Sequence, residues 1–220
     1  MAADRLIPTP YGEGRLVAHR ARRATATLLL GHGAGAGIDT PDLQALAAHL
    51  PRHGITVYRF EQPWKVAGRK VAGAPATLDA GLRAAADRIR SARGGLALPL
   101  IVGGRSAGAR SAARCAIALG AAGCLALAFP LHPPGRPERS RLSELVGVGV
   151  TTLVVQGARD PMGRPEEFPP EVDLAVVPEA DHSFRVAARS GISEEDVTGI
   201  VVEATLEWAV REVIGNQTPV

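Results

Sequence analysis

The chain has 220 residues, of which 46% are hydrophobic and 21% charged, and it carries a net charge of +3. This balance is that of an ordinary globular protein and excludes a disordered or fibrous chain. Of its 25 basic residues only Lys65 and Lys70 are lysines; the arginines are scattered, and aromatic residues make up only 4%. Because a nucleic-acid surface usually combines a basic stripe with aromatic stacking platforms, the composition argues against a nucleic-acid partner.

No targeting or membrane segment is evident in the sequence. Its opening, MAADRLIPTPYGEGRLVAHRARR, lacks the apolar centre of a secretory signal peptide, and no apolar run approaches the ~20 residues that a membrane span needs. The only cysteines, Cys115 and Cys124, are better explained as two reduced, buried thiols than as a disulfide framework. We therefore expect a cytoplasmic protein that does not bind membranes, with one domain over residues 1–220.

In chain order, the predicted elements are an opening without helix and then alternating strands and helices. Through residue 23 the pattern indicates an antiparallel hairpin that includes a strand at 14–19. Apolar runs predict further strands at 26–30, 55–60, 98–103, 124–129, 151–156 and 173–177, and helical spacing predicts helices at 41–50, 76–93, 106–120 and 193–214. Most of these strands are continuously apolar, which is typical of parallel strands covered on both faces. The sequence thus predicts an α/β fold, a mostly parallel sheet with helices on both faces.

The segment GGRSAG (103–108) places one serine between two glycines, directly after a predicted strand and before a predicted helix. In the G-x-S-x-G turn, small residues two positions either side avoid clashes, and the serine hydroxyl is exposed above the sheet. Gly104, Ser106 and Gly108 match this pattern. A phosphate-binding loop would need a lysine where Ala109 stands. We therefore interpret Ser106 as a nucleophile, the alternative being a plain glycine-rich turn.

A second glycine-rich loop, GHGAGAG (31–37), follows the predicted strand at 26–30. A dinucleotide-binding fingerprint fails there, because Ala36 or Ile38 occupies the position of its last glycine. A hydrolase builds half of its oxyanion hole in such a loop, where glycines let backbone N–H groups approach a carbonyl. We expect the N–H groups of Ala34 and Ala107 to be the two donors.

A reactive serine needs a base and an acid that orients the base. Asp160 and His182 each follow a predicted strand, and the chain order Ser106, Asp160, His182 is that of the α/β-hydrolase fold. The alternatives are a turn-forming Asp-Pro pair and an ordinary loop histidine. Asp181 is a rival acid, but a neighbour in sequence cannot easily aim at the ring, so we expect it to shape the loop. His32 is expected to be structural.

With GHGAG, GGRSAG, QGARDP and EADHSF in this order, the chain resembles the α/β-hydrolase family across nearly its full length. Within that family it is similar to the small branch of testis-expressed protein thirty and the third subunit of the NSL chromatin complex, and more distantly to dienelactone hydrolases. The run FPLHPPGRPE (129–138) adds to this likeness. The resemblance implies a Ser–His–Asp hydrolase fold but no particular substrate. Dienelactone hydrolases use a cysteine where this chain has Ser106, so their substrate is not inferred.

These patterns predict a serine hydrolase, esterase-like, that transfers an acyl group from a small molecule to water without a metal or organic cofactor. Thioester or peptide cleavage would use the same residues, and a non-catalytic interaction module is the alternative from another class. Only residues 130–150 lie between two predicted strands where many lipases insert a lid, so we expect an open site without a large lid, suited to small soluble esters.

Two further residues are expected near the substrate. Arg105, beside the nucleophile, either attracts anionic substrates or extends into solvent. His132 either lines the mouth of the pocket or belongs to a rigid loop.

Overall fold

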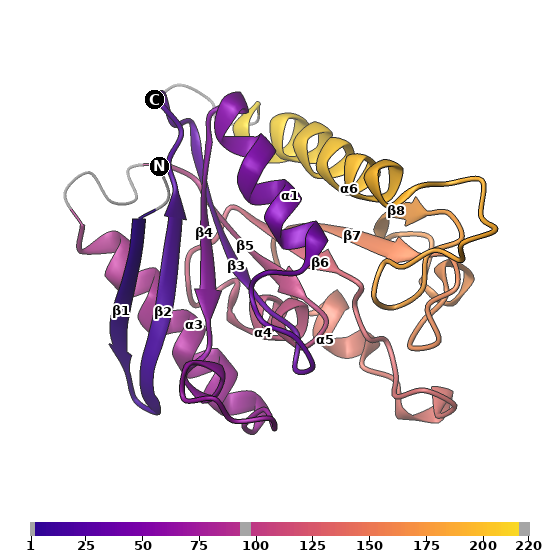
Figure 1. Cartoon of the computed structure of the whole chain (residues 1–220), viewed down its shortest axis with the longest axis horizontal. Helices are drawn as coiled ribbons and strands as arrows, with labels where there is room; N and C mark the ends of the chain where they lie inside the picture. The colour runs from indigo at the N-terminus through magenta and orange to yellow at the C-terminus, as the bar shows by residue number, and fades with distance from the viewer. Residues whose placement is uncertain (1–2, 93–97, 216–220) are drawn as a thin grey trace.

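In residues 3–92 and 98–215, which the computed structural model describes, eight strands form one sheet (Figure 1). They are β1 (Ala3–Thr9), β2 (Gly12–His19), β3 (Ala26–Gly31), β4 (Ile55–Glu61), β5 (Leu100–Arg105), β6 (Gly123–Leu127), β7 (Thr151–Gly157) and β8 (Asp173–Val177). The order across the sheet is β1-β2-β4-β3-β5-β6-β7-β8.

The pairing of the strands confirms the predicted mostly parallel sheet. β1 and β2 form the antiparallel hairpin, and β2 pairs antiparallel with β4. All pairs from β4 to β8 are parallel. The loops after β3, β5, β7 and β8 therefore leave the same edge of the sheet, where ligands bind in open α/β folds.

Helices cover both faces of this sheet. They are α1 (Pro41–His49), α2 (Pro63–Val66), α3 (Pro75–Arg90), α4 (Ala107–Cys115), α5 (Leu142–Val146) and α6 (Glu194–Trp208). α1 and α6 lie together over one face, and α3 and α4 pack together on the other (Figure 1). The predicted apolar face of the helix at 76–93 is confirmed, because Leu78, Leu82 and Ile89 of α3 are buried; residue 93 lies outside the described residues.

The core has one half on each face of the sheet. Every residue of β3, β4, β5 and β6 is buried, as expected for strands that are covered on both faces. Side chains alternate between the two halves: Leu29 packs with the side chains of α3 and α4, and Leu28 and Leu30 pack with those of α1 and α6.

Some predicted ends differ from the structure, and most have a local backbone cause. The strand predicted at 124–129 ends at Leu127, because Ala128 has a left-handed φ of 45°. The helix predicted at 106–120 extends only over α4, since turns follow Cys115. The strand predicted at 98–103 begins two residues later, at Leu100.

Of the two residues predicted to cap helices, Ser193 does so with its side chain and Thr40 does not. Ser193 caps α6 as its Ser-x-x-Asp spacing predicts: its Oγ accepts a hydrogen bond of 3.1 Å from the N–H of Asp196, whose carboxylate accepts the N–H of Ser193. Thr40 precedes α1 at the N-cap position, but its side chain makes no cap hydrogen bond. α6 continues beyond Trp208 as a π-helical turn over Ala209–Ile214.

Residues 130–150 form no large lid. They hold only α5 and a 3-10 turn at Pro137–Arg139. Arg110 donates two hydrogen bonds to the carboxylate of Glu144, at 2.7 and 2.6 Å, and Arg114 donates a third at 3.1 Å. These bonds hold α5 against α4. Of the helices in residues 3–92 and 98–215, none is both long and apolar enough to cross a membrane.

Candidate active site

Ser106 stands at a sharp turn between β5 and α4. Its backbone has φ 52° and ψ −112°, a left-handed conformation that residues other than glycine rarely adopt. The N–H of Ser106 donates to the carbonyl of Leu127 at 2.9 Å, and the residue is half-buried. Strained backbone of this kind persists where the surrounding structure fixes it, and it is concentrated at functional sites.

Close backbone packing explains the two glycines that flank this turn. A Cβ on Gly104 would lie 2.7 Å from the carbonyl oxygen of Gly31 and 2.7 Å from the carbonyl carbon of Gly108. A Cβ on Gly108 would lie 2.7 Å from the carbonyl carbon of Gly31. The turn therefore packs directly against the end of β3 and the loop that follows it.

Replacing Gly108 with alanine is expected to push the serine turn away from β3. Overpacking of this kind costs about 1–3 kcal/mol, so we expect Gly108→Ala to unfold at lower urea concentration and to react more slowly with a fluorophosphonate probe. Gly199→Ala is the matched control, because a Cβ there meets open space on α6. Wild-type values of both quantities in Gly108→Ala would show that the close contact is not needed.

The structure brings Ser106, His182 and Asp160 into one hydrogen-bonded row, here called the Ser–His–Asp relay. His182, on the loop after β8, has Nε2 2.9 Å from Ser106 Oγ and Nδ1 2.7 Å from Asp160 Oδ2. Asp160, on the loop after β7, is fully buried, whereas Ser106 and His182 are only half-buried. With a carboxylate facing Nδ1, that nitrogen carries the hydrogen, and Nε2 is free to accept the hydroxyl proton.

The carboxylate of Asp160 is held on both oxygens. Besides His182, Asp160 Oδ2 accepts a hydrogen bond of 2.8 Å from the side-chain amide of Gln156, and Oδ1 accepts one of 2.8 Å from the N–H of Met162. The same amide donates to the carbonyl of Gly163 at 2.8 Å. Gln156 was not predicted from the sequence; the available signal was a polar residue directly after the apolar run at 153–155.

The loop that carries His182 is stabilised by Asp181. One oxygen of the Asp181 carboxylate accepts hydrogen bonds from the N–H groups of Ser183, at 2.7 Å, and Arg185, at 2.9 Å. The backbone N–H of Asp181 also donates to the carbonyl of Arg185 at 2.9 Å. Asp181 therefore shapes the loop, as the sequence predicts, while Asp160 faces the imidazole.

The loop after β3 lies directly beside Ser106. A Cβ on Gly33 would lie 3.4 Å from Ser106 Cβ, so the two backbones are close. Ala34 follows Gly33 and is exposed. Ala107 is the first residue of α4, where helix N–H groups have no intrahelical acceptor. The N–H groups of Ala34 and Ala107 thus lie on the two segments that meet at the serine.

His32 holds this loop from the inside. Its Nδ1 is 2.8 Å from the carbonyl of Gly33, and its Nε2 accepts the N–H of Gln62 at 3.0 Å. The ring is 1% exposed and its centroid lies 5.4 Å from that of Trp64. One ring nitrogen donates and the other accepts, so these contacts select a neutral imidazole with a structural role.

The burial of His32 makes the stability of this loop sensitive to acid. Burial lowers the pKa of His32 below its ordinary value of 6.5. Because the folded pKa is the lower one, this contribution to stability is complete above pH 6.5 and is lost as the pH falls from there towards the folded pKa. We expect an NMR titration of the folded protein to show His32 titrating below 6.5. A His32 signal that titrates at or above that value would contradict the neutral assignment.

The alternative that Arg105 extends into solvent is wrong. Its side chain turns inward and the residue is 6% exposed. Nη2 donates a hydrogen bond of 2.8 Å to the carbonyl of His182, and Nε lies 3.0 Å from Asp42 Oδ2. Asp42 was not predicted from the sequence, because its pairing with Arg105 depends on how α1 packs against the serine turn.

His132 is also not available to line an open pocket mouth. The residue is 6% exposed; its Nε2 lies 2.8 Å from Glu167 Oε2, and its Nδ1 lies 2.9 Å from the carbonyl of Pro133. Both ring nitrogens thus face acceptors. The hydrogen bond to Pro133 and the carboxylate of Glu167 raise the pKa of His132, against the opposing effect of burial. These contacts fit the rigid-loop alternative, and the backbone N–H of His132 also donates to the carbonyl of Met162, two residues after Asp160.

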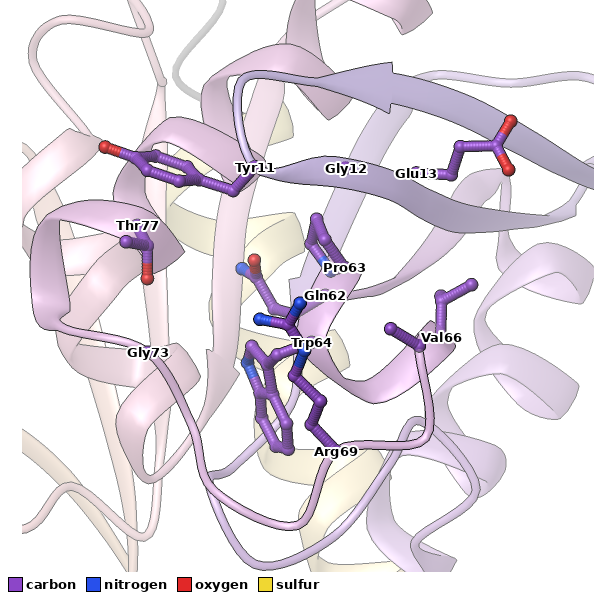
Figure 2. Close-up of a pocket in the computed structure, with 11 residues that line it drawn as sticks. Tyr11, Gly12, Glu13, Gln62, Pro63, Trp64, Val66, Arg69, Gly73 and Thr77 are labelled. Carbon is purple, nitrogen blue, oxygen red and sulfur yellow. The ribbon is translucent and has the colours of Figure 1, made fainter.

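A cavity of about 430 Å³ lies between the β1–β2 turn, α2 and the start of α3 (Figure 2). Trp64 and Gln62, which contact His32, form part of its wall, and Arg69 and Tyr11 also line it. The Ser–His–Asp relay lies outside this cavity, beyond the loop after β3. In the described part of the chain, no group of three or more His, Cys, Asp or Glu side chains is placed to hold a metal ion.

Solved structures share this architecture at low sequence identity. An alpha-beta serine hydrolase homologue from Coxiella burnetii is 18% identical, with a TM-score of 0.71 over 91% of this chain and 96% of its own. An a/b serine hydrolase without lid from Xanthomonas campestris is 22% identical, with a TM-score of 0.69 over 94% of each chain. A dienelactone hydrolase from Anabaena variabilis is 17% identical, with a TM-score of 0.74 over 97% and 98%.

At these identities the structural likeness establishes the fold alone. The family comparison adds to it, because the model of the alpha/beta hydrolase domain matches residues 24–210, from just before β3 to just after α6. The match spans the serine turn, the loop after β3 and the loops that carry Asp160 and His182. The chain therefore belongs to the alpha/beta hydrolase domain family.

Proposed function

We propose that this protein is a serine hydrolase that cleaves an ester or a related acyl bond of a small soluble substrate. The observation that carries the proposal is the unbroken Ser–His–Asp relay, with links of 2.9 and 2.7 Å, at a strained turn above a parallel sheet. Nucleophile, base and orienting acid at hydrogen-bond distance from one another are the requirement for acyl transfer through a serine.

In the proposed first half-reaction, Ser106 Oγ attacks the substrate carbonyl while His182 Nε2 takes the hydroxyl proton. The N–H groups of Ala34 and Ala107 stabilise the oxyanion of the tetrahedral intermediate. When that intermediate collapses, the bond to the leaving group breaks and His182 gives its proton to the leaving oxygen. Asp160 keeps Nδ1 protonated and stabilises the imidazolium. The acyl group is then bonded to Ser106.

In the second half-reaction water replaces the alcohol. His182 removes a proton from the attacking water, the oxygen adds to the acyl carbonyl, and the second tetrahedral intermediate collapses with return of the proton to Ser106 Oγ. The products are the carboxylic acid and the free enzyme. Every proton in this sequence moves through His182, so no other acid or base is required.

The proposed preference for small soluble esters rests on the segment at 130–150, which is held on α4 and forms no large lid. We expect kcat/KM to be highest for p-nitrophenyl acetate or butyrate and to fall with longer acyl chains. A panel of p-nitrophenyl esters, assayed with and without emulsified long-chain substrate, measures this. A sharp rise of activity at the lipid interface would contradict the proposal.

The placement in the small branch resembling testis-expressed protein thirty and the third NSL subunit belongs to this proposal, and it rests on the sequence resemblance. A cytoplasmic location is proposed as well, on the ground that Cys115 and Cys124 are both buried and free. Thioester or peptide cleavage by the same relay remains the alternative within hydrolase chemistry. The alternative from another class is an interaction module that keeps the hydrolase scaffold without the reaction.

Covalent labelling separates the hydrolase from the interaction module. A reactive serine displaces fluoride from a fluorophosphonate probe and keeps the phosphonyl group on its oxygen. We expect one adduct per chain, which peptide mass spectrometry locates on Ser106. A protein that is folded but takes up no probe and hydrolyses no ester or thioester would favour the non-catalytic module.

A further inference from the structure

The guanidinium of Arg105 connects three segments around the candidate active site: the end of β5, the loop after β8 and the start of α1. Arg105 directly precedes Ser106 in the chain, so its backbone belongs to the serine turn. Its Nη2 donates to the carbonyl oxygen of His182 at 2.8 Å. Its Nε lies 3.0 Å from Asp42 Oδ2, in the first turn of α1, directly after the loop that passes Ser106. One buried cation therefore connects the serine turn with the loop that carries the base and with the first turn of α1.

The guanidinium of Arg105 forms a hydrogen bond with His182 but only an ion pair with Asp42. Although Arg105 Nε and Asp42 Oδ2 are 3.0 Å apart, the angles do not suit a hydrogen bond, and each atom has no hydrogen-bond partner in the described residues. The bond to the carbonyl of His182 is well formed. Arg105 is thus oriented by the loop that carries the base, while Asp42 supplies the neutralising charge.

A third contact fixes the same loop. The guanidinium carbon of Arg105 lies 5.7 Å from the centre of the Phe184 ring, a distance at which a cation is attracted to an aromatic face. Phe184 follows His182 by two residues, is 6% exposed and has a left-handed φ of 53°. Arg105 therefore contacts this loop at two points, the carbonyl of His182 and the ring of Phe184.

Burying an ion pair carries a large desolvation cost. Asp42 is 3% exposed and Arg105 6%, and pairs at such depth are often no more stabilising than apolar side chains of similar volume. Stability alone does not account for a charge pair whose better hydrogen bond goes to the residue that carries the base. A positioning role does, because this hydrogen bond holds the backbone of the residue whose imidazole reacts.

We propose that the Arg105–Asp42 pair positions His182, so that its imidazole stays in line between Ser106 and Asp160. This inference rests on the proposed hydrolase function. Arg105 does not touch the substrate; it acts through the backbone of His182 and is a positioning residue. Displacing a reacting group by about 1 Å can cost about 100-fold in rate, so holding this backbone has a direct effect on turnover.

Arg105→Met removes the donor to His182 and keeps an apolar side chain of similar length. We expect kcat to fall by about 10–100-fold with KM nearly unchanged, since the substrate loses no contact. Arg105→Lys keeps the charge near Asp42 and is expected to recover part of kcat. Arg114→Met is the matched control. Arg114, on α4, forms a two-bond pair with Asp79 of α3 at 2.9 and 2.7 Å and one bond of 3.1 Å to Glu144 of α5, none of which involves His182. Its loss is therefore expected to lower stability and leave kcat per active site unchanged.

A double variant separates positioning from stability. Arg105→Met alone leaves Asp42 as a buried charge without its partner, which is destabilising; adding Asp42→Asn removes that charge. We expect the double variant to regain stability against urea while kcat, counted per site by fluorophosphonate titration, stays as low as in Arg105→Met. Recovery of kcat together with stability, or a wild-type kcat in Arg105→Met, would overturn the positioning role.

An NMR measurement keeps this test distinct from that of the hydrolase function. The Nδ1 proton of His182, in its 2.7 Å bond to Asp160, is expected far downfield in wild-type protein and weakened or shifted in Arg105→Met and in the double variant, but not in Arg114→Met. An unchanged signal in Arg105→Met refutes the positioning of His182, whatever the activity. If the wild-type protein takes up no fluorophosphonate probe, the proposed function is refuted. The NMR comparison then still decides whether Arg105 positions His182.

Discussion

Replacing Ser106 with alanine is expected to abolish both fluorophosphonate labelling and ester hydrolysis. Removing the nucleophile of a Ser–His–Asp relay lowers kcat by about 10⁶-fold, because His182 and Asp160 have no function without the hydroxyl they activate. Only the weak catalysis from substrate binding and oxyanion donors survives. The measurement is the initial rate of p-nitrophenyl acetate hydrolysis, together with the amount of probe bound per chain.

The matched control for this variant is Ser111→Ala, one turn further along α4. Ser111 is 1% exposed, and its Oγ has no hydrogen-bond partner in the described residues. Removing that hydroxyl takes nothing from the Ser–His–Asp relay, so labelling and hydrolysis are expected at wild-type rates. Undiminished labelling of Ser106→Ala would place the reactive group elsewhere and remove the basis of the proposed mechanism.

The fold was predictable because strands that are buried on both faces appear in the sequence as short runs rich in apolar residues. The four central strands, β3 to β6, lie within two residues of their predicted bounds, and α6 begins after Ser193 as its capping pattern predicts. The ends of elements were less predictable, since they depend on single backbone conformations. The left-handed φ of Ala128, for example, ends β6 two residues early, and no residue type announces it.

The members of the Ser–His–Asp relay were predictable for a topological reason. Parallel strands deliver the residues that follow them to one edge, so chain order and spacing were enough to bring Ser106, Asp160 and His182 together. Which way a polar side chain turns is a different kind of question. Arg105 directly precedes Ser106 and His132 lies on the loop after β6, yet each side chain points to a carboxylate on a distant segment, Asp42 or Glu167.

Replacing Asp160 with asparagine is expected to have the second-largest effect on activity. An asparagine fits the space but has one acceptor and one donor where the carboxylate has two acceptors. Asp160 Oδ1 faces the N–H of Met162, and Oδ2 faces both Gln156 and His182. Either orientation of the amide therefore sets its NH₂ group against another donor. If the NH₂ faces His182, the imidazole takes the tautomer that cannot accept the proton of Ser106. If it faces Met162, the relay keeps its shape but loses the charge that stabilises the imidazolium.

We therefore expect Asp160→Asn to lower kcat by about 10⁴-fold and to cost about 1–3 kcal/mol in stability. Asp181→Asn is the control that distinguishes the two neighbouring carboxylates. Both loop hydrogen bonds of Asp181 go to the same oxygen, Oδ1, which an asparagine carbonyl replaces without placing two donors face to face. Its kcat should stay within a few-fold of wild type. A larger loss of kcat in Asp181→Asn than in Asp160→Asn, both measured on folded protein, would mean that the acid acting on His182 has been assigned to the wrong residue. The buried position of Asp160 argues for the opposite result, because a charge shielded from water acts on the imidazolium more strongly than one at the surface.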